Sequence, residues 1–253
     1  MRNIRSAVKQ AVFSKDLLIG LIGVIAVVFA ASVSDIFKAL RAEGPLPNAF
    51  HNSFIENAIV SDVMKFALPI IAALPFTASF VNDLKSGFLK SYLHRTSRKD
   101  YIAGKCMACA VSGGAVLALG IVASYLISAI VFLPMEDTMP TDAASLAFYA
   151  DLMKRIVLVF LSGALWSLCG LALSAMTCSK YMAYASPFII YYILIILHER
   201  YFDRSYFLYP KEWIDPSSRW MLGEWGVIVL LLGLTVMVGA VFHYTAKRRI
   251  SQL

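Results

Sequence analysis

The longest uncharged stretch of the chain is CMACAVSGGAVLALGIVASYLISAIVFLPM, residues 106–135. A helix rises about 1.5 Å per residue, so a run of this length can cross the ~30 Å hydrocarbon core of a bilayer. The run is continuous and lacks the alternating segments of roughly ten residues that are typical of a membrane β-barrel. It therefore predicts a membrane-spanning helix.

Other long apolar runs flank this one. The chain as a whole is 59% hydrophobic and 15% charged, whereas a soluble protein carries about 25% charged residues. We therefore expect an all-α integral membrane protein that forms a single domain over residues 1–253. Six transmembrane helices are predicted, at about residues 17–34, 63–82, 104–134, 154–179, 181–198 and 224–246.

The charges are distributed unevenly between the two sides that this topology defines. With the N-terminus inside, the inner segments are 1–16, 83–105, Lys180 and 247–253, and they hold 14 of the 23 Lys and Arg residues but three of the 16 acids. This asymmetry follows the positive-inside rule. It predicts a multi-pass protein of the cytoplasmic membrane with both termini in the cytoplasm. It also accounts for the net charge of +7 without a nucleic-acid partner.

The N-terminal segment MRNIRSAVKQAVFSK, residues 1–15, is amphipathic. Ile4, Ala7, Val8 and Val12 share one helical face, and basic residues share the other. This pattern favours a helix lying in the inner membrane surface before the first span. An ordinary basic flank that only fixes topology, or a cleaved secretory signal, remain the alternatives.

No motif in the sequence indicates catalysis or nucleotide binding by this chain. His-Glu-x-x-His, Gly-x-Ser-x-Gly and Walker A patterns are missing, and the span interiors carry no Asp, Glu, Lys or Arg, which argues against an ion-coupled transporter. The glycines of VSGGA, residues 111–115, are interpreted as small residues for close helix packing. The four cysteines are interpreted as packing thiols, because the pair Cys106 and Cys109 has no second pair or nearby His that would complete a metal site. We therefore expect no cofactor in this chain.

The most polar segment is DLKSGFLKSYLHRTSRKDYIAGK, residues 83–105, between the second and third spans. A helix that begins at Asp83 as its N-cap would place Leu84, Phe88 and Leu89 or Tyr92 on one face. Apolar and aromatic anchors rimmed by charge suit a small docking surface. A basic loop whose apolar residues rest on the lipid interface is the alternative.

This segment resembles the coupling region of ABC-2 type permeases, the six-span membrane subunits of ATP-driven exporters. The order D-x-x-x-G…R-x-S-R-x-x-Y-x-x-x-K carries the resemblance. In that family the inner loop between spans two and three holds a coupling helix that sits in a cleft of the ATPase subunit. The implied ATPase-coupling residues are Asp83, Leu84, Lys85, Gly87, Phe88, Leu89, Tyr92, Leu93, Arg95, Ser97, Arg98, Tyr101 and Lys105. We expect Arg98 and Lys105 to hold the segment against the third span or against lipid phosphates.

Two further features fit the layout of that family. The outer connection 199–224 is rich in Tyr, Phe and Trp, which favours short re-entrant helices at the membrane surface, and Asp215-Pro216 predicts the start of a helix that runs through Trp220. The prolines within the spans, Pro69, Pro75 and Pro187, predict kinks that either line a pathway or serve packing.

The resemblance implies a permease subunit, not an enzyme. Its expected partners are an ABC ATPase subunit that binds ATP and Mg²⁺, a second permease copy or a relative, and membrane lipids. The implied activity is export of hydrophobic or amphipathic cargo, with antimicrobial or cytolytic peptides ahead of drugs and lipid-linked glycans. A membrane-embedded lipid-modifying enzyme and a non-transporting scaffold or sensor are the alternatives.

Overall fold

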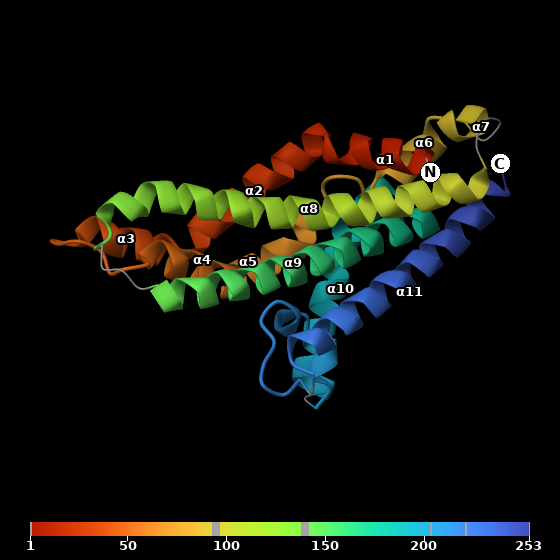
Figure 1. Cartoon of the computed structure of the whole chain (residues 1–253). Coiled ribbons are helices and arrows are strands. Elements are labelled where there is room, and N and C mark those ends of the chain that lie inside the picture. The colour runs from red at the N-terminus through yellow and green to blue at the C-terminus, as the bar shows by residue number, and fades with distance from the viewer. Residues whose placement is uncertain (1, 93–96, 138–141, 203, 221, 253) are drawn as a thin grey trace.

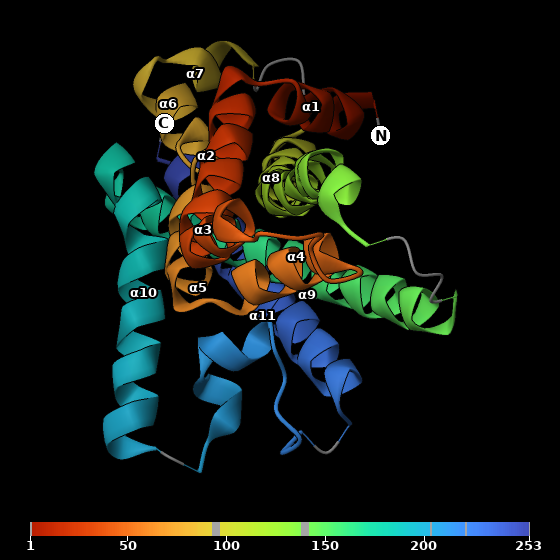
Figure 2. The ribbon, with the colours of Figure 1, turned by 90° about the vertical axis from the view of Figure 1, so that its left-hand side faces the viewer.

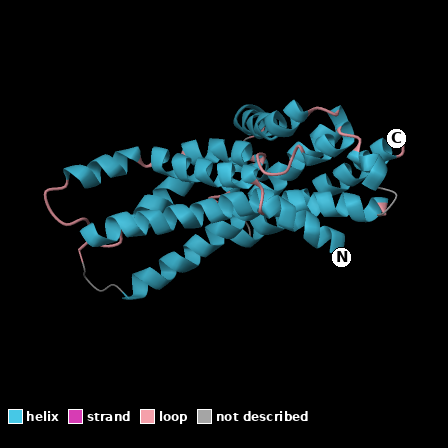
Figure 3. Cartoon of the chain, turned by 90° about the horizontal axis from the view of Figure 1, so that it is seen from above, coloured by secondary structure: helices cyan, strands magenta, loops and turns pink. Residues whose placement is uncertain are grey.

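The structure is a computed structural model that describes residues 2–92, 97–137, 142–202, 204–220 and 222–252. All elements in this part of the chain are helices, as Figure 3 shows. In the same described residues, Leu46 and Glu136 form an isolated parallel β-bridge. The predicted all-α character is therefore confirmed for the described residues.

The chain folds into an elongated bundle (Figure 1). The first half contains α1 (Arg2–Val12), α2 (Lys15–Ala31), α3 (Val33–Arg41), α4 (Phe50–Val60), α5 (Asp62–Ala72), α6 (Ser79–Lys85) and α7 (Phe88–Tyr92). The second half contains α8 (Arg98–Phe132), η1 (Leu133–Met135), α9 (Asp142–Thr177), α10 (Lys180–Tyr201), η2 (Tyr206–Leu208), η3 (Pro210–Trp213) and α11 (Glu224–Ile250). Both chain ends lie with α7 at one end of the molecule, and α3 lies at the other (Figure 1).

Among the described residues, four helices are long and apolar enough to cross a membrane: α8, α9 from Phe148 onward, α10 and α11. The helices α1 and α2 are bent by 49° relative to each other, and they supply a fifth such segment if the pair is one span. These findings support a membrane protein with several spanning helices. The count of six spans stays a prediction.

The second predicted span, residues 63–82, is not one continuous helix. α5 ends at Ala72, the chain turns through residues 73–78, and α6 begins at Ser79. Proline lacks the N–H that would continue a helix, and its ring collides with the carbonyl four residues earlier. Pro75 therefore ends α5 within one turn. Pro69 and Pro187, in contrast, are buried inside α5 and α10 without ending those helices.

The helices α8 and α9 pack closely through small residues. A Cβ atom built on Gly113 would lie 2.4 Å from the side chain of Ser167, and one built on Gly114 would lie 2.7 Å from Phe160. This geometry agrees with the predicted packing role of the two glycines. Cys109 lies in the same contact, where its thiol donates to the Ser167 carbonyl at 3.4 Å. All four cysteines are free thiols.

α4 packs with the end of α8 that is distant from the chain termini. There the backbone N–H of His51 donates to Oε1 of Glu136 at 2.7 Å, and the His51 ring Nδ1 lies 2.7 Å from the same oxygen. Both side chains are nearly buried. This contact ties the N-terminal end of α4 to the segment that follows α8.

The connection between α10 and α11 does not form the predicted helix from Pro216 through Trp220. Helical turns occur earlier, in η2 and η3, and residues 215–220 form bends and turns beside the bundle (Figure 2). The carboxylate of Asp215 accepts from Arg155 of α9 at 2.9 Å. Ser217 and the Trp220 indole both donate to the carboxylate of Glu212, each at 3.0 Å. Side-chain bonds to α9 and η3 therefore fix this segment.

Two clusters of buried apolar side chains form the core. The larger one contains residues of α2, α4, α5, α8 and α9. It extends to Trp213, whose ring stacks on that of Trp166 with 5.6 Å between the ring centroids. The smaller one lies toward the chain termini and joins α6, α7, α8, α9 and α11 through residues such as Phe80, Leu89 and Phe242. The smaller cluster positions the polar segment that the sequence singled out.

Candidate functional site

The first part of the polar segment forms the end of α6 and the short helix α7, which contact the start of α8 through side chains. α6 ends at Lys85, and α7 begins at Phe88. Between them Gly87 adopts a φ of +74°, a left-handed conformation that glycine reaches without steric cost. The prediction of one helix that begins at Asp83 and includes Tyr92 is therefore wrong, because this turn divides the segment. Leu93 and Arg95 lie outside the described residues.

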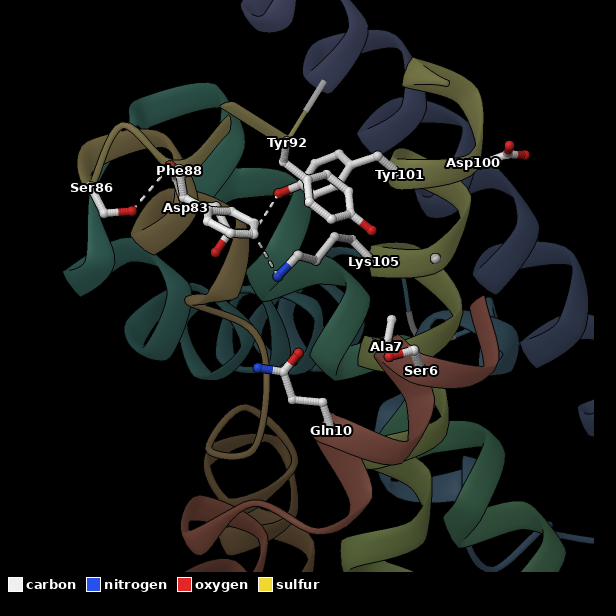
Figure 4. A pocket seen from close by; sticks show the side chains of 11 residues that line it. Ser6, Ala7, Gln10, Asp83, Ser86, Phe88, Tyr92, Asp100, Tyr101 and Lys105 are labelled. Atoms are coloured by element: carbon white, nitrogen blue, oxygen red, sulfur yellow. Dashed lines mark hydrogen bonds and ion pairs between the residues drawn. The ribbon is translucent and has the colours of Figure 1, made fainter. Parts of the chain in front are cut away.

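Asp83 is not the N-cap of a helix, because it lies inside α6. Its carboxylate accepts a hydrogen bond from the Tyr101 hydroxyl at 2.7 Å and pairs with the Lys105 ammonium at 2.8 Å. Tyr101 and Lys105 are four residues apart on α8, so they lie on the same helical face. The Asp83 and Lys105 side chains are 21% and 11% exposed. Two bonds to one partly buried carboxylate thus clamp α6 onto α8 (Figure 4).

Lys105 has a second contact that fixes its position. Its Nζ lies 4.7 Å from the centroid of the Phe76 ring, within the range of a favourable cation–π interaction. Phe76 belongs to the turn between α5 and α6. Lys105 of α8 therefore contacts both the turn and α6.

The start of α8 is set by Ser97. Its hydroxyl accepts from the backbone N–H of Asp100 at 3.1 Å, an N-cap bond that satisfies one of the free amides of the first turn. Asp100 in that turn also complements the positive end of the helix dipole. Ser97 thereby fixes where α8 begins, and with it the positions of Tyr101 and Lys105.

The apolar residues of the segment separate into inward and outward groups. Leu89 is buried in the smaller core cluster, and Leu84 packs against that cluster. Phe88 is 47% exposed and stacks on Tyr92 at 5.2 Å between ring centroids, and Tyr92 lies 5.8 Å from the Tyr101 ring. Phe88 and Tyr92 therefore form a partly exposed aromatic surface on α7, and Leu89 of the same helix is buried in the core.

A pocket of about 440 Å³ opens beside this pair. α6, α7 and α8 form most of its wall, and α1 closes it with Ser6, Ala7 and Gln10 (Figure 4). The helix predicted at residues 1–15 is thus present as α1, and it packs along α8. Its residue Ala11 is fully buried. The pocket brings together the two segments that the sequence marked as an interface helix and a docking helix.

The remaining predicted site residues lie outside this pocket. Lys85 is exposed at the end of α6. Arg98 is exposed at the start of α8 and lines a different cleft, shared with α11. Of the predicted kinks, Pro187 packs beside Gly170 of α9, where a Cβ built on the glycine would lie 3.1 Å from the proline ring. That contact favours the packing interpretation for Pro187.

Sequence reasoning missed a group of ion pairs between α4, the start of α5, α9, η3 and the residues that follow η3. Arg155 pairs with Asp215 at 2.9 Å and with Glu56 at 3.5 Å, and Lys211 pairs with Asp62 at 3.1 Å. Burial acts to lower the pKa of the Lys211 ammonium, but the hydrogen bond to Asp62 and the charges of Tyr209, Asp62 and Glu199 together raise it. The partners in these pairs are at least 60 residues apart along the chain, so no local pattern indicates them.

Comparison with known proteins gives no relative, since no family model, no curated protein and no solved structure matches the chain.

Proposed function

We propose that this chain is the membrane subunit of an ATP-driven exporter of the ABC-2 type. In this proposal the chain pairs with a second permease copy or a relative, and a separate ATPase chain binds ATP and Mg²⁺. The cargo is hydrophobic or amphipathic, with antimicrobial or cytolytic peptides as the leading class. The multi-pass topology in the cytoplasmic membrane, with six spans and both termini in the cytoplasm, belongs to the same proposal.

The arrangement of α6 and α7 on α8 supports this function most directly. The Phe88–Tyr92 pair is partly exposed, while Asp83 and Leu89 of the same segment are fixed to the bundle through Lys105 and the smaller core cluster. A motor subunit that pushed on α7 would therefore move α8 with it. A loop that only rested on lipid would need no such clamp to a spanning helix.

The surface around Phe88 has the composition of a small docking site. Large aromatic side chains at the centre of such a site account for most of the binding energy, and surrounding polar groups exclude water. Here Ser86, Asp100 and Gln10 surround the aromatic pair along the pocket. α1 completes the surface, so we expect an ATPase to contact both α7 and α1.

Co-purification tests the proposal directly. The tagged full-length chain, extracted from its own cells, should retain an ABC ATPase that mass spectrometry identifies. Phe88→Ala should weaken that complex by roughly 2–4 kcal/mol, in the range of an interface hot spot. Phe13→Ala is the matched control, because Phe13 is an exposed phenylalanine between α1 and α2 that does not line the pocket.

The outcomes separate an exporter from a scaffold or sensor. Cargo-stimulated ATP hydrolysis in the purified complex supports an exporter, and ATPase binding without stimulation supports a scaffold or sensor. Retention of no ATPase, or equal retention by the wild-type and Phe88→Ala chains, would overturn the docking role of α7.

A further inference from the structure

A second cleft, of about 530 Å³, lies between the start of α8 and the end of α11. It is separate from the pocket beside Phe88, because different residues of the first turn of α8 line it. Arg98 and Lys99 line it from α8, and Lys247 and Arg248 line it from α11. Figure 1 shows the two helix ends together at the end of the molecule that also holds the chain termini.

The charge in this cleft is uncompensated within the described part of the chain. All four cationic side chains are exposed, and none of them forms an ion pair with a described acidic residue. The described residues that line the cleft include no Asp or Glu. Four like charges around one cavity repel one another, so an anion between them is stabilised.

The walls of the cleft are held in place by the core. Ile102 of α8 lines the cleft with 1% of its surface exposed, and it packs in the smaller core cluster with Phe242, Ala246 and Ile250 of α11. The spacing between the α8 bases and the α11 bases is therefore fixed before any ligand binds. A preorganised site loses less entropy on binding than a set of independent surface side chains.

An apolar surface leads away from the cleft along α11. Tyr244 lines the cleft, and the residues one and two turns before it, Val241 and Met237, are 43% and 56% exposed. Spacings of three and four residues place these side chains on the same helical face as Arg248. α11 is long and apolar enough to cross a membrane, so its basic end marks a membrane–water boundary. The cleft thus has a charged end at the boundary and an apolar track toward the bilayer.

We propose that this cleft binds the phosphate-bearing headgroup of an anionic membrane lipid. The bases of α8 and α11 would contact the phosphate, and the acyl chains would lie along Val241 and Met237. Basic pockets between helices at a membrane surface have the charge and the position that such headgroups require. A free phosphate ion would use the same bases but not the apolar track, so the two sources differ in a measurable way. The proposal does not depend on the exporter function.

Lipid selectivity of the full-length chain in nanodiscs provides the test. The probe is the fraction of spin-labelled phosphatidylglycerol that the protein immobilises, compared with spin-labelled phosphatidylcholine. In the triple variant Arg98→Gln, Lys247→Gln, Arg248→Gln, the preference for phosphatidylglycerol over phosphatidylcholine should fall by a factor of about five or more, since each base near the surface contributes to binding. The control Arg5→Gln, Lys85→Gln, Lys180→Gln removes the same charge from exposed positions that do not line the cleft, and it should keep most of the preference.

Three results would overturn the proposal. An equal loss in the control variant would show a general charge effect and no local site. Unchanged selectivity in the cleft variant would place anionic lipids elsewhere. Displacement of the labelled lipid by millimolar inorganic phosphate at constant ionic strength would assign the cleft to a free anion. Thermal unfolding of each variant in detergent identifies any loss of fold, and in that case the single variant Lys247→Gln, at an exposed position, repeats the comparison.

Discussion

Gly163 of α9 faces Gly113 of α8 so closely that a Cβ atom on Gly163 would lie 2.5 Å from the Gly113 carbonyl oxygen. Backbone occupies this contact, so the neighbour cannot move aside by rotating a side chain. The two helices approach each other at this point because neither residue has a side chain. Transmembrane helices commonly associate through small residues of this kind.

Gly163→Ala should therefore destabilise the protein by about 1–3 kcal/mol, the usual cost of overpacking a filled interior. Thermal or denaturant unfolding in detergent measures the effect. Gly233→Ala is the matched control, because Gly233 is also helical and a Cβ atom added there would meet no neighbouring atom within 4 Å. That variant should be unchanged or slightly more stable. Equal effects of the two substitutions would contradict the close contact.

Asp83→Asn should release α6 and α7 from α8. The substitution leaves the Lys105 ammonium without its carboxylate in a largely buried position, which costs about 1–3 kcal/mol locally. Hydrogen exchange over residues 79–92 should increase, while exchange in the middle of α8 stays slow. Asp83→Asn and Lys105→Met together should cost less than the sum of the two single changes. Strictly additive effects would show that the two groups do not interact.

The ion pair between α9 and the turn at residues 204–220 predicts local loosening in Arg155→Met. Loss of the guanidinium removes the bonds to Asp215 and Glu56, and Arg155 is only 22% exposed, so about 1 kcal/mol of local stability is expected to be lost. Limited proteolysis within residues 204–220 should accelerate. Lys154→Met is the neighbouring control, since Lys154 is half exposed and its ion pairs go to Asp151 and Glu224, outside this turn. Faster cleavage in the control alone would contradict the assignment.

The proposed topology predicts opposite labelling of two exposed positions. In intact cells, Ser218→Cys should react with a membrane-impermeant maleimide, whereas Asp100→Cys should react only after lysis. Both residues are exposed in the structure, so burial does not explain a difference between them. The unsubstituted chain supplies the background from its own four cysteines. Labelling of position 100 from outside would reverse the orientation.

The sequence predicts the long helices well because a span is defined by a local property. The runs at 181–198 and 224–246 correspond to α10, Lys180–Tyr201, and α11, Glu224–Ile250. The length of the uncharged run underestimates α9. This helix begins at Asp142, twelve residues before its predicted start at about residue 154, because a helix that has formed can continue through residues that carry charges.

The predictions for single acidic residues fail because a carboxylate has more than one possible partner. The sequence favours a helix N-cap at both Asp83 and Asp215, in which the carboxylate accepts from nearby backbone amides. In the structure Asp83 pairs with Lys105, and Asp215 pairs with Arg155. A bond to a charged donor is stronger than one to a backbone amide. The donors lie about 20 and 60 residues away along the chain, so only the folded protein brings them within reach.

The contact between Gly113 and Gly163 also has a mechanical consequence. α8 is continuous from Arg98 to Phe132, about 50 Å at 1.5 Å per residue, and Gly113 lies somewhat before its midpoint. Because α8 is one continuous helix, its Lys105 end and the end that precedes Glu136 belong to the same element. The close backbone approach at Gly113 and Gly163 leaves no room for a side chain between α8 and α9, so we expect a displacement of either end of α8 to require a shift of α9 as well.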